Sequence, residues 1–342
     1  MSPKERTSLV IMILLSSCLF LTCEKKRVGL ETEGGFPESP KNLTIFNSEY
    51  DDYNSDLEPG VYDINTFVFS SSRNSQGNDF DIMLFSLGMS YPFEEDVVTI
   101  YESSGVSGIY LCIGQMLPTI NSSNNEFGPY IYNCNLNNDK HEGEFLFFYS
   151  QEESKKLNIK FMVNELDLSE PQKNGYKWTG PHDANIINTP EFSEEYISIK
   201  NDIIYYCSNC SGSYNIYQKT ISSDVNIIDF LNQPYDSIYD PVINVNSDAD
   251  DKCPYIIDDF MVFISNRPGG FGGYDLWYSK LINEEWNEPQ NFGSNINTEF
   301  DEYRPIIVKY EEIKNDLMIF SSNRKDGFGG FDLYYVGIYE TK

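Results

Sequence analysis

The chain carries the stretch Asp259-Phe-Met-Val-Phe-Ile-Ser-Asn-Arg267 and, 57 residues later, Asp316-Leu-Met-Ile-Phe-Ser-Ser-Asn-Arg324. A Gly-rich run follows each copy and ends in Tyr274-Asp-Leu-Trp277 or in Phe331-Asp-Leu-Tyr334. Each unit therefore joins a run of β-branched and aromatic residues to a turn and a second aromatic run, which is typical of antiparallel strands. Because the pattern repeats at a fixed period, it predicts the architecture more firmly than any single residue does.

Three further copies of this pattern lie upstream, and a second shared element precedes each copy. The upstream copies begin at Asn65, Glu144 and Asp202, which gives five in total. The second element is clearest in Ile296-Asn-Thr-Glu-Phe-Asp-Glu-Tyr-Arg-Pro305, and residues 47–53 match its central part position by position. We therefore expect an all-β protein, a β-propeller with five four-stranded blades.

The phase of the repeat predicts how the ring closes. The segment near residues 42–46 corresponds to the last strand of a blade, whereas the chain stops at a third strand, Phe331–Ile338. We expect the N-terminal strand to pair into the C-terminal blade, because this closure hides strand edges that would otherwise pair with other chains.

One spacing departs from the pattern. The distance from Asp81 to Asn121 is 40 residues, whereas the equivalent distance from Asp275 to Asn297 is 22. The extra residues, within 86–119, predict either a hairpin made from 97–101 and 109–113 or a sixth, degenerate blade. We expect no helix here, since we find no sustained 3.6-residue apolar period.

The segment Ser265–Leu276, with Trp286 and Pro289 after it, resembles the WD40-like propeller repeat of the TolB type. The match is strongest in the last two copies and weak in the second and third. This resemblance implies a propeller of the bacterial envelope that acts as a protein-interaction platform. It does not imply an enzyme, and a fold by itself does not settle function.

The N-terminus has the features of a secretory signal peptide. Lys4 and Arg6 precede an apolar run that continues to Leu21. Cys23, followed by polar residues, is the expected lipid-modified residue of a bacterial lipoprotein, and Cys18 is the alternative.

These features divide the chain into a signal peptide at 1–22, a tether at 23–36 and one propeller domain at 37–342. The expected location is the bacterial cell envelope, in the outer membrane or periplasm, with contact to the membrane through the lipid anchor only.

Charge narrows the range of partners. The net charge of −29 excludes binding to nucleic acid through the bulk field and favours cationic partners or divalent ions.

Export permits disulfides, and Cys112 and Cys134 are a candidate pair. Cys207 and Cys210 have zinc-like spacing, but with two histidines in the chain we expect no zinc site there.

Arginine and aspartate occur together in three of the five copies, always eight residues apart. The second and third copies lack both residues. This pattern predicts structural ion pairs that brace the loop between the second and third strands, since one partner without the other would leave a charge uncompensated. The expected pairs are Arg73 with Asp81, Arg267 with Asp275, and Arg324 with Asp332.

Acidic residues precede the first strand of each blade and should surround one mouth of the central channel. Those with no arginine nearby are Glu126, Glu194 and Glu195. These three carboxylates are candidates for a calcium or cationic-ligand site, and solvated loop carboxylates are the favoured alternative. We expect no cofactor unless calcium binds there.

Two functional classes follow from these observations. The first is a non-catalytic, lipid-anchored platform that binds envelope proteins or glycan, with no catalytic residues. The second is a glycan-active enzyme, since five-bladed propellers host glycosidases that use two carboxylates. The repetitive sequence favours the first class, because an active site is expected to break the repeat, and the acidic residues recur in equivalent places.

Overall fold

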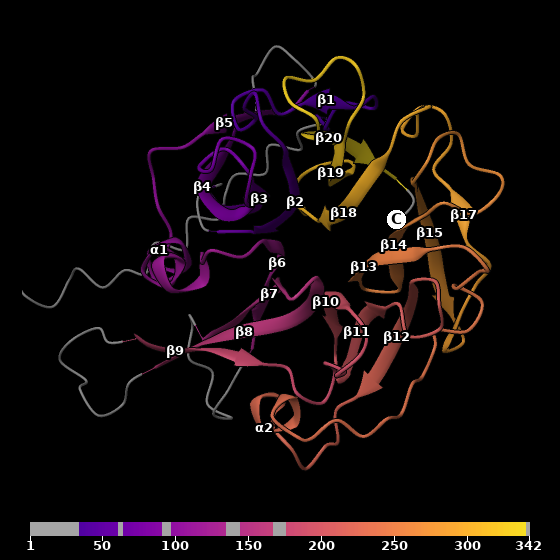
Figure 1. Ribbon diagram of the computed structural model, residues 1–342. Coiled ribbons are helices and arrows are strands. Elements are labelled where there is room, and N and C mark those ends of the chain that lie inside the picture. Colours follow the sequence, from indigo (N-terminus) through magenta and orange to yellow (C-terminus); the bar gives the residue numbers. More distant parts are fainter. Residues whose placement is uncertain (1–33, 61–63, 91–96, 135–143, 167–175, 340–342) are drawn as a thin grey trace, which may run out of the picture. The chain divides into compact units, whose positions relative to one another are not determined.

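The computed structural model describes residues 34–60, 64–90, 97–134, 144–166 and 176–339. These residues form five antiparallel sheets around a central axis, so the predicted five-bladed β-propeller is confirmed (Figure 1). The strands of blade 1 are β2 (Asp52–Glu58), β3 (Ile64–Ser71), β4 (Asp81–Ser90) and β5 (Thr99–Glu102). Those of blade 2 are β6 (Glu126–Asn133), β7 (Phe145–Glu153), β8 (Lys156–Leu166) and β9 (Tyr176–Asp183).

Blades 3, 4 and 5 follow the same order. Blade 3 has β10 (Glu194–Lys200), β11 (Ile203–Ser208) and β12 (Asn215–Thr220). Blade 4 has β13 (Asp251–Ile257), β14 (Phe260–Ser265) and β15 (Asp275–Ile282), with the short strands β16 (Glu285–Trp286) and β17 (Gln290–Asn291) both paired to β15. Blade 5 has β18 (Glu302–Val308), β19 (Asp316–Ser322) and β20 (Asp332–Ile338).

The predicted closure is confirmed. Strand β1 (Lys41–Asn42) pairs with β20 and supplies the fourth strand of blade 5, with Asn42 opposite Tyr334. The segment before β1 is held as well, because Asn315 accepts a hydrogen bond from the Phe36 backbone nitrogen at 2.8 Å and donates one to the Phe36 carbonyl at 3.0 Å.

The hydrophobic core lies between neighbouring blades. In β19, Leu317 and Ile319 pack in the cluster shared with blade 1, whereas Met318 and Phe320 pack in the cluster shared with blade 4. Side chains alternate between the two faces of a strand, so the second strand of a blade contributes to the interfaces with both neighbouring blades. Truncating a fully buried phenylalanine such as Phe320 typically costs about 3–5 kcal/mol.

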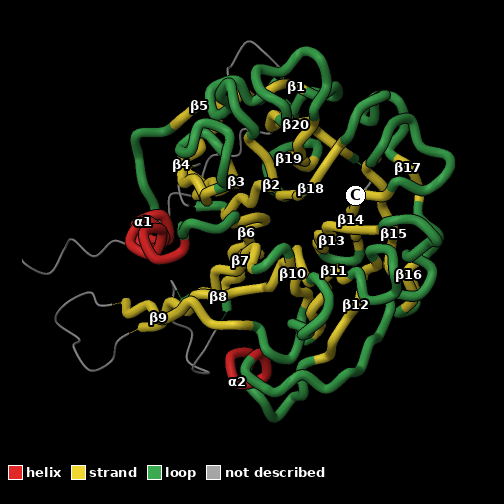
Figure 2. The backbone as a smooth tube through the Cα atoms, in the orientation of Figure 1, coloured by secondary structure: helices red, strands yellow, loops and turns green. Residues whose placement is uncertain are grey.

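The insertion between blades 1 and 2 differs from both predictions. Its first part forms β5, the fourth strand of blade 1, but residues 109–113 belong to helix α1 (Gly108–Ile120) and not to a strand (Figure 2). Ser107 caps the helix by accepting a hydrogen bond from the Tyr110 nitrogen at 3.0 Å. Ile113, Met116 and Ile120 are buried at helical spacing, so the expected absence of a helix was wrong.

A second helix, α2 (Ile227–Leu231), follows β12. Neither of these helices in the described part of the chain has the length and apolar character needed to cross a membrane. The described residues form five sheets, so no sixth blade is present among them.

The described cysteines are free thiols. Cys112 packs beside the cluster of blades 1 and 2, and Cys134 beside the cluster of blades 2 and 3, so the expected disulfide does not form. Cys207 is buried and Cys210 is half-buried, and they are not bonded to each other. The predictions on Cys18, Cys23, the signal peptide and most of the tether concern residues outside the described part of the chain.

Candidate functional site at the channel mouth

The first strand of each blade lines the channel, and the loops before these strands join consecutive blades (Figure 1). Asn297, in the loop before β18, accepts a hydrogen bond from the Leu276 nitrogen at 2.8 Å and donates one to the Leu276 carbonyl at 3.0 Å. The same pair of bonds recurs between Asn47 and Leu333, Asn121 and Ile82, Asn188 and Ile159, and Asn246 and Ile216. We call these five residues the asparagine clasps.

The residue just before each first strand also fastens two blades together. Asp301 accepts a hydrogen bond from the Tyr274 nitrogen at 2.8 Å, at the start of the third strand of the preceding blade. The equivalent acceptors and donors are Asp51 and Phe331, Asn125 and Phe80, Ser193 and Leu157, and Asp250 and Tyr214. The recurrence of acidic residues at this position therefore has a structural cause.

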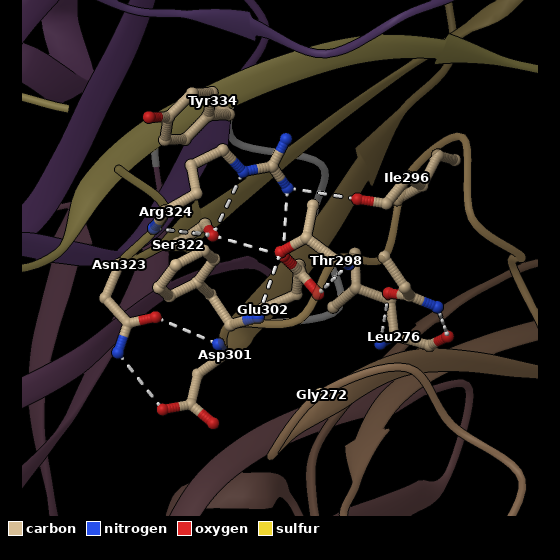
Figure 3. Close-up of polar contacts among 12 residues, drawn as sticks. Gly272, Leu276, Ile296, Thr298, Asp301, Glu302, Ser322, Asn323, Arg324 and Tyr334 are labelled. Carbon is tan, nitrogen blue, oxygen red and sulfur yellow. Dashed lines mark hydrogen bonds and ion pairs between the residues drawn. The ribbon is translucent and has the colours of Figure 1, made fainter. Parts of the chain in front are cut away.

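The first residue of each of these strands is a buried carboxylate. Glu302 is fully buried and accepts hydrogen bonds from the Thr298 hydroxyl at 2.6 Å, from the Ser322 hydroxyl at 3.1 Å and from Arg324 at 3.0 Å (Figure 3). Its counterparts, also fully buried, are Asp52, Glu126, Glu194 and Asp251.

In the structure, the three arginines have partners that differ from the predicted ones. Each guanidinium pairs with the first carboxylate of the strand beside it and not with the aspartate eight residues later, which corrects the predicted pairs. The pairs are Arg73 with Asp52 at 2.6 Å, Arg267 with Asp251 at 2.5 Å, and Arg324 with Glu302 at 3.0 Å.

The aspartates expected to pair with the arginines have other contacts. Asp275 accepts hydrogen bonds from the Phe271 and Gly272 nitrogens, and Asp332 accepts them from the Phe328 and Gly329 nitrogens. Asp81 accepts one from the side chain of Asn74. These aspartates therefore shape the loop by binding its side chains and backbone rather than the arginine.

Glu126 and Glu194 have partners even though their blades lack the arginine. Glu126 accepts hydrogen bonds from Gln151 at 2.8 Å and from the Ser122 hydroxyl at 2.6 Å. Glu194 accepts one from Ser208 at 2.8 Å, and burial raises the pKa of both carboxyl groups. Among the described residues, no three metal-binding side chains come together, so Glu126, Glu194 and Glu195 do not form the expected cation site.

The second residue of each first strand is where the five blades differ. These residues are Tyr53, Phe127, Glu195, Lys252 and Tyr303, and we call them the mouth ring. Their side chains contact one another between neighbouring blades: the Tyr53 ring lies 5.9 Å from Phe127 and 6.3 Å from Tyr303, and the Lys252 ammonium lies 5.8 Å from the Tyr303 ring.

Four more aromatic residues surround the mouth ring. Phe331 lies 5.6 Å from Tyr53, and Tyr274 lies 5.6 Å from Tyr303. Phe80 lies 5.0 Å from Tyr53, and the Lys252 ammonium lies 3.9 Å from the centre of the Tyr214 ring. The aromatic members of both sets are half-buried, so parts of their rings remain accessible at the mouth.

Glu195 and Lys252 form an ion pair inside this aromatic surrounding. Their charged atoms lie 2.6 Å apart, and their side chains are 2% and 10% exposed. Burial by itself would lower the pKa of Lys252, but nearby negative charge, first that of Glu195, outweighs burial and raises this pKa well above its ordinary value. Lys252 therefore stays protonated at physiological pH.

A bulge beneath the mouth ring sets its side chains in place. The third residue of every first strand has positive φ, between 46° and 58°, and the pairing with the second strand shifts register there. Such bulges redirect side chains. In three blades this residue is Asn54, Tyr196 or Arg304; Asn54 donates to the Tyr196 hydroxyl at 3.1 Å, and the Arg304 guanidinium lies 5.5 Å from the Tyr196 ring.

One member of this site was predicted from the sequence, and the others were not. Glu195 was a candidate, although for a cation site that does not form. Lys252 and the aromatic residues were missed, because the sequence alone does not show which side chains meet at the axis. Aligning the five first strands with one another would have shown that blades 3 and 4 depart from the aromatic pattern.

A groove of 880 Å³ lies at the opposite end of the propeller, between blades 3 and 4. Lys200 and Asp259 bridge the two blades there with an ion pair of 2.6 Å, and Tyr205 and Trp286 are among its lining residues. Because Lys200 ends β10 and Asp259 follows β13, this groove lies at the far end of the first strands and is separate from the mouth ring.

Comparison with known proteins gives no match to any family model or curated protein. Similar solved structures include the catalytic domain of a GH62 α-L-arabinofuranosidase from Coprinopsis cinerea, with 12% identity, coverage of 89% of this chain and 95% of that one, and a TM-score of 0.43. An α-L-arabinofuranosidase from Lactobacillus brevis has 8% identity, coverage of 87% and 94%, and a TM-score of 0.49.

A third similar structure is a GH43_1 enzyme from Xanthomonas citri complexed with xylotriose, with 8% identity, coverage of 88% and 90%, and a TM-score of 0.47. Such low identity transfers neither a residue role nor an activity to this chain.

These comparisons correct three expectations. The TolB-type resemblance is wrong, since no family model matches and the named structures are glycoside hydrolases. The expectations of a non-catalytic platform and of a chain that is not an enzyme are corrected as well, since the similar structures named here are glycoside hydrolases.

Proposed function

We propose that this chain is a glycan-active enzyme that binds an oligosaccharide at the channel mouth and hydrolyses a glycosidic bond there. The observation that carries the proposal is the ion pair of Glu195 and Lys252. All five blades keep the same fastening contacts, yet blades 3 and 4 replace aromatic residues with a carboxylate and an ammonium group at the axis. The repeat is therefore broken by chemically active side chains where all five blades converge.

The surroundings of this pair suit a sugar. A sugar ring has an apolar face of C–H bonds and a rim of hydroxyl groups. The half-buried rings of Tyr53, Phe127 and Tyr303 offer aromatic surface for the face, and Glu195 and Lys252 offer an acceptor and donors for the hydroxyl groups.

Hydrolysis of a glycosidic bond ordinarily needs two carboxyl groups. We assign Glu195 as the first, with Lys252 fixing its orientation. We assign Asp250 of blade 4 as the second. It accepts hydrogen bonds from the Tyr214 nitrogen and, at 2.8 Å, from the Tyr274 hydroxyl, and both tyrosines contact the mouth ring. We also propose that the protein works in the cell envelope, anchored through Cys23 or Cys18.

The test is hydrolysis of a panel of arabino- and xylo-oligosaccharides by the purified protein, measured by chromatography of the released sugars. We expect Glu195→Gln to reduce hydrolysis by about 10²–10⁴-fold, the usual contribution of a catalytic acid or base. Asp301→Asn is the matched control, because it alters an acidic residue equivalent to Asp250 in another blade and keeps the oxygen that accepts from Tyr274.

Two results would count against the proposal. If the wild-type protein hydrolyses no oligosaccharide of the panel, the proposed hydrolase function is wrong. If Glu195→Gln and the control lose activity equally, Glu195 has no special role. Glu195→Gln leaves Lys252 without its partner, so the thermal unfolding of this variant is measured in parallel. The double variant Glu195→Gln/Lys252→Gln removes both charges, and it shows whether activity is lost through the chemistry of Glu195 or through lower stability.

A further inference from the structure

Two phenylalanines stand exposed at equivalent positions of blades 4 and 5. Phe271 is 49% exposed and Phe328 is 60% exposed, each four residues after the bracing arginine of its blade. Blade 1, which also has the arginine, has Gly77 at this position. The fold therefore does not require an aromatic residue here, and these two side chains call for another explanation.

The loops that hold these residues are fixed in place. Asp275 accepts hydrogen bonds from the Phe271 nitrogen at 2.7 Å and the Gly272 nitrogen at 3.0 Å. A Cβ on Gly272 would lie 2.1 Å from the Phe300 carbonyl oxygen, so this loop rests directly on the loop that leads into β18. The exposed ring thus projects from a rigid support.

The loop of blade 5 is built in the same way. Asp332 accepts hydrogen bonds from the Phe328 nitrogen at 2.5 Å and the Gly329 nitrogen at 3.3 Å. A Cβ on Gly329 would lie 2.1 Å from the Tyr50 carbonyl oxygen, in the loop that leads into β2. Because both loops rest on the segments that enter first strands, both phenylalanines lie at the mouth end of the propeller.

An aromatic surface therefore continues outward from the channel axis. Three residues after Phe271 comes Tyr274, and three residues after Phe328 comes Phe331, and both of these contact the mouth ring. Along two adjacent blades, aromatic side chains thus extend from the axis to the exposed rim.

We propose that Phe271 and Phe328 form an outer binding surface for the sugar chain, beyond the units held at Glu195, so that the protein prefers long oligosaccharides to short ones. This inference rests on the proposed function. Aromatic rings on a fixed backbone bind without a large ordering cost, and successive sugar rings present the flat C–H faces that such rings take.

The experiment measures dissociation constants of a xylo-oligosaccharide series from two to six units by calorimetry, using Glu195→Gln as a non-hydrolysing background. Phe271→Ala/Phe328→Ala in that background is compared with Ile282→Ala, which removes a half-exposed apolar side chain at the opposite end of β15. We expect the double variant to bind the six-unit chain about tenfold more weakly and the two-unit chain within about twofold of the background.

Two outcomes overturn the inference while leaving the proposed function intact. One is an equal loss for two-unit and six-unit chains, and the other is no loss for any length. If the Glu195→Gln background binds no member of the series, the inference falls together with the proposed function. Circular dichroism of each variant confirms that the fold is unchanged.

Discussion

The asparagine clasps and the mouth ring lie a few residues apart in every blade, yet they behave in opposite ways. All five clasps use the same residue type and make the same two hydrogen bonds, with lengths between 2.7 and 3.0 Å. The mouth ring has four residue types in five positions. The clasp position, which joins each blade to its neighbour, is therefore uniform, whereas the mouth ring position, which faces the axis, is not.

The largest expected effect concerns the charged pair of the mouth ring. Lys252→Met leaves the buried Glu195 carboxylate without its counterion, so we expect the free energy of unfolding to fall by about 3–5 kcal/mol in chemical denaturation. Lys252→Met/Glu195→Met removes both charges and should lie within about 1 kcal/mol of the wild type.

The distinction between the clasps and the mouth ring is wrong if the double variant is as unstable as the single one. In that case the ion pair would belong to the fastening of the blades, like the clasps. A double variant that is stable but inactive would confirm that blades 3 and 4 carry charges for a reason other than stability.

The second test concerns a clasp. Asn297→Ala leaves the buried nitrogen of Leu276 without a partner and leaves its carbonyl with the Phe292 nitrogen alone, so we expect a loss of about 2–4 kcal/mol in the free energy of unfolding. Asn297→Asp keeps the acceptor for the Leu276 nitrogen but turns an oxygen toward the Leu276 carbonyl, so it should destabilise the fold as well. Hydrolysis measured well below the melting temperature should not change.

Asn188→Ala in blade 3 is the matched variant for this test. Similar losses for the two clasps would confirm that the clasps are equivalent. A loss of activity at Asn297, with the fold intact, would show that the separation between fastening and function is incomplete.

The smallest effect is expected at the far end of β2. Burial, then the nearby charge of Asp56, raises the pKa of Glu58 from 4.5 to about 8. A carboxyl group whose pKa is raised in the folded state stabilises the fold fully below pH 4.5, and this contribution is lost as the pH rises to about 8. Glu58→Gln should therefore gain about 1–3 kcal/mol over the wild type at pH 9 and nothing at pH 4.

Thermal unfolding of both proteins across this pH range provides the measurement. Identical pH profiles would show that Glu58 titrates normally. Because Tyr53 lies in the same strand, unchanged hydrolysis by Glu58→Gln would also show that the two ends of β2 are independent.

The fold could be predicted because its decisive signal is local and repeated. Strand-forming runs at a period of 57 residues and a displaced phase at the two ends gave both the five blades and the pairing of β1 with β20. Helix α1 could not be predicted as easily, since its buried residues Ile113, Met116 and Ile120 cover about two turns and occur once.

The site was harder to predict, because contacts depend on which side chains the blades bring together. The joint occurrence of arginine and aspartate showed that both belong to one kind of loop, but not that Arg324 reaches Glu302 while Asp332 binds backbone nitrogens. Likewise, Glu195 and Lys252 are 57 residues apart in the sequence, and only the packing of blade 3 against blade 4 places their charged atoms 2.6 Å apart.

The closure of blade 5 also constrains how the protein is made. Asn47 donates a hydrogen bond to the carbonyl of Leu333, across 286 residues of chain. Phe36, Leu43 and Phe46 are buried in the finished protein, but part of their cover comes from the strands of blade 5, which are made long after them. Until β20 has been synthesised, blade 1 alone can cover this early apolar segment, through contacts such as Phe46 with Phe67, so newly made chains should expose apolar surface that the finished protein buries.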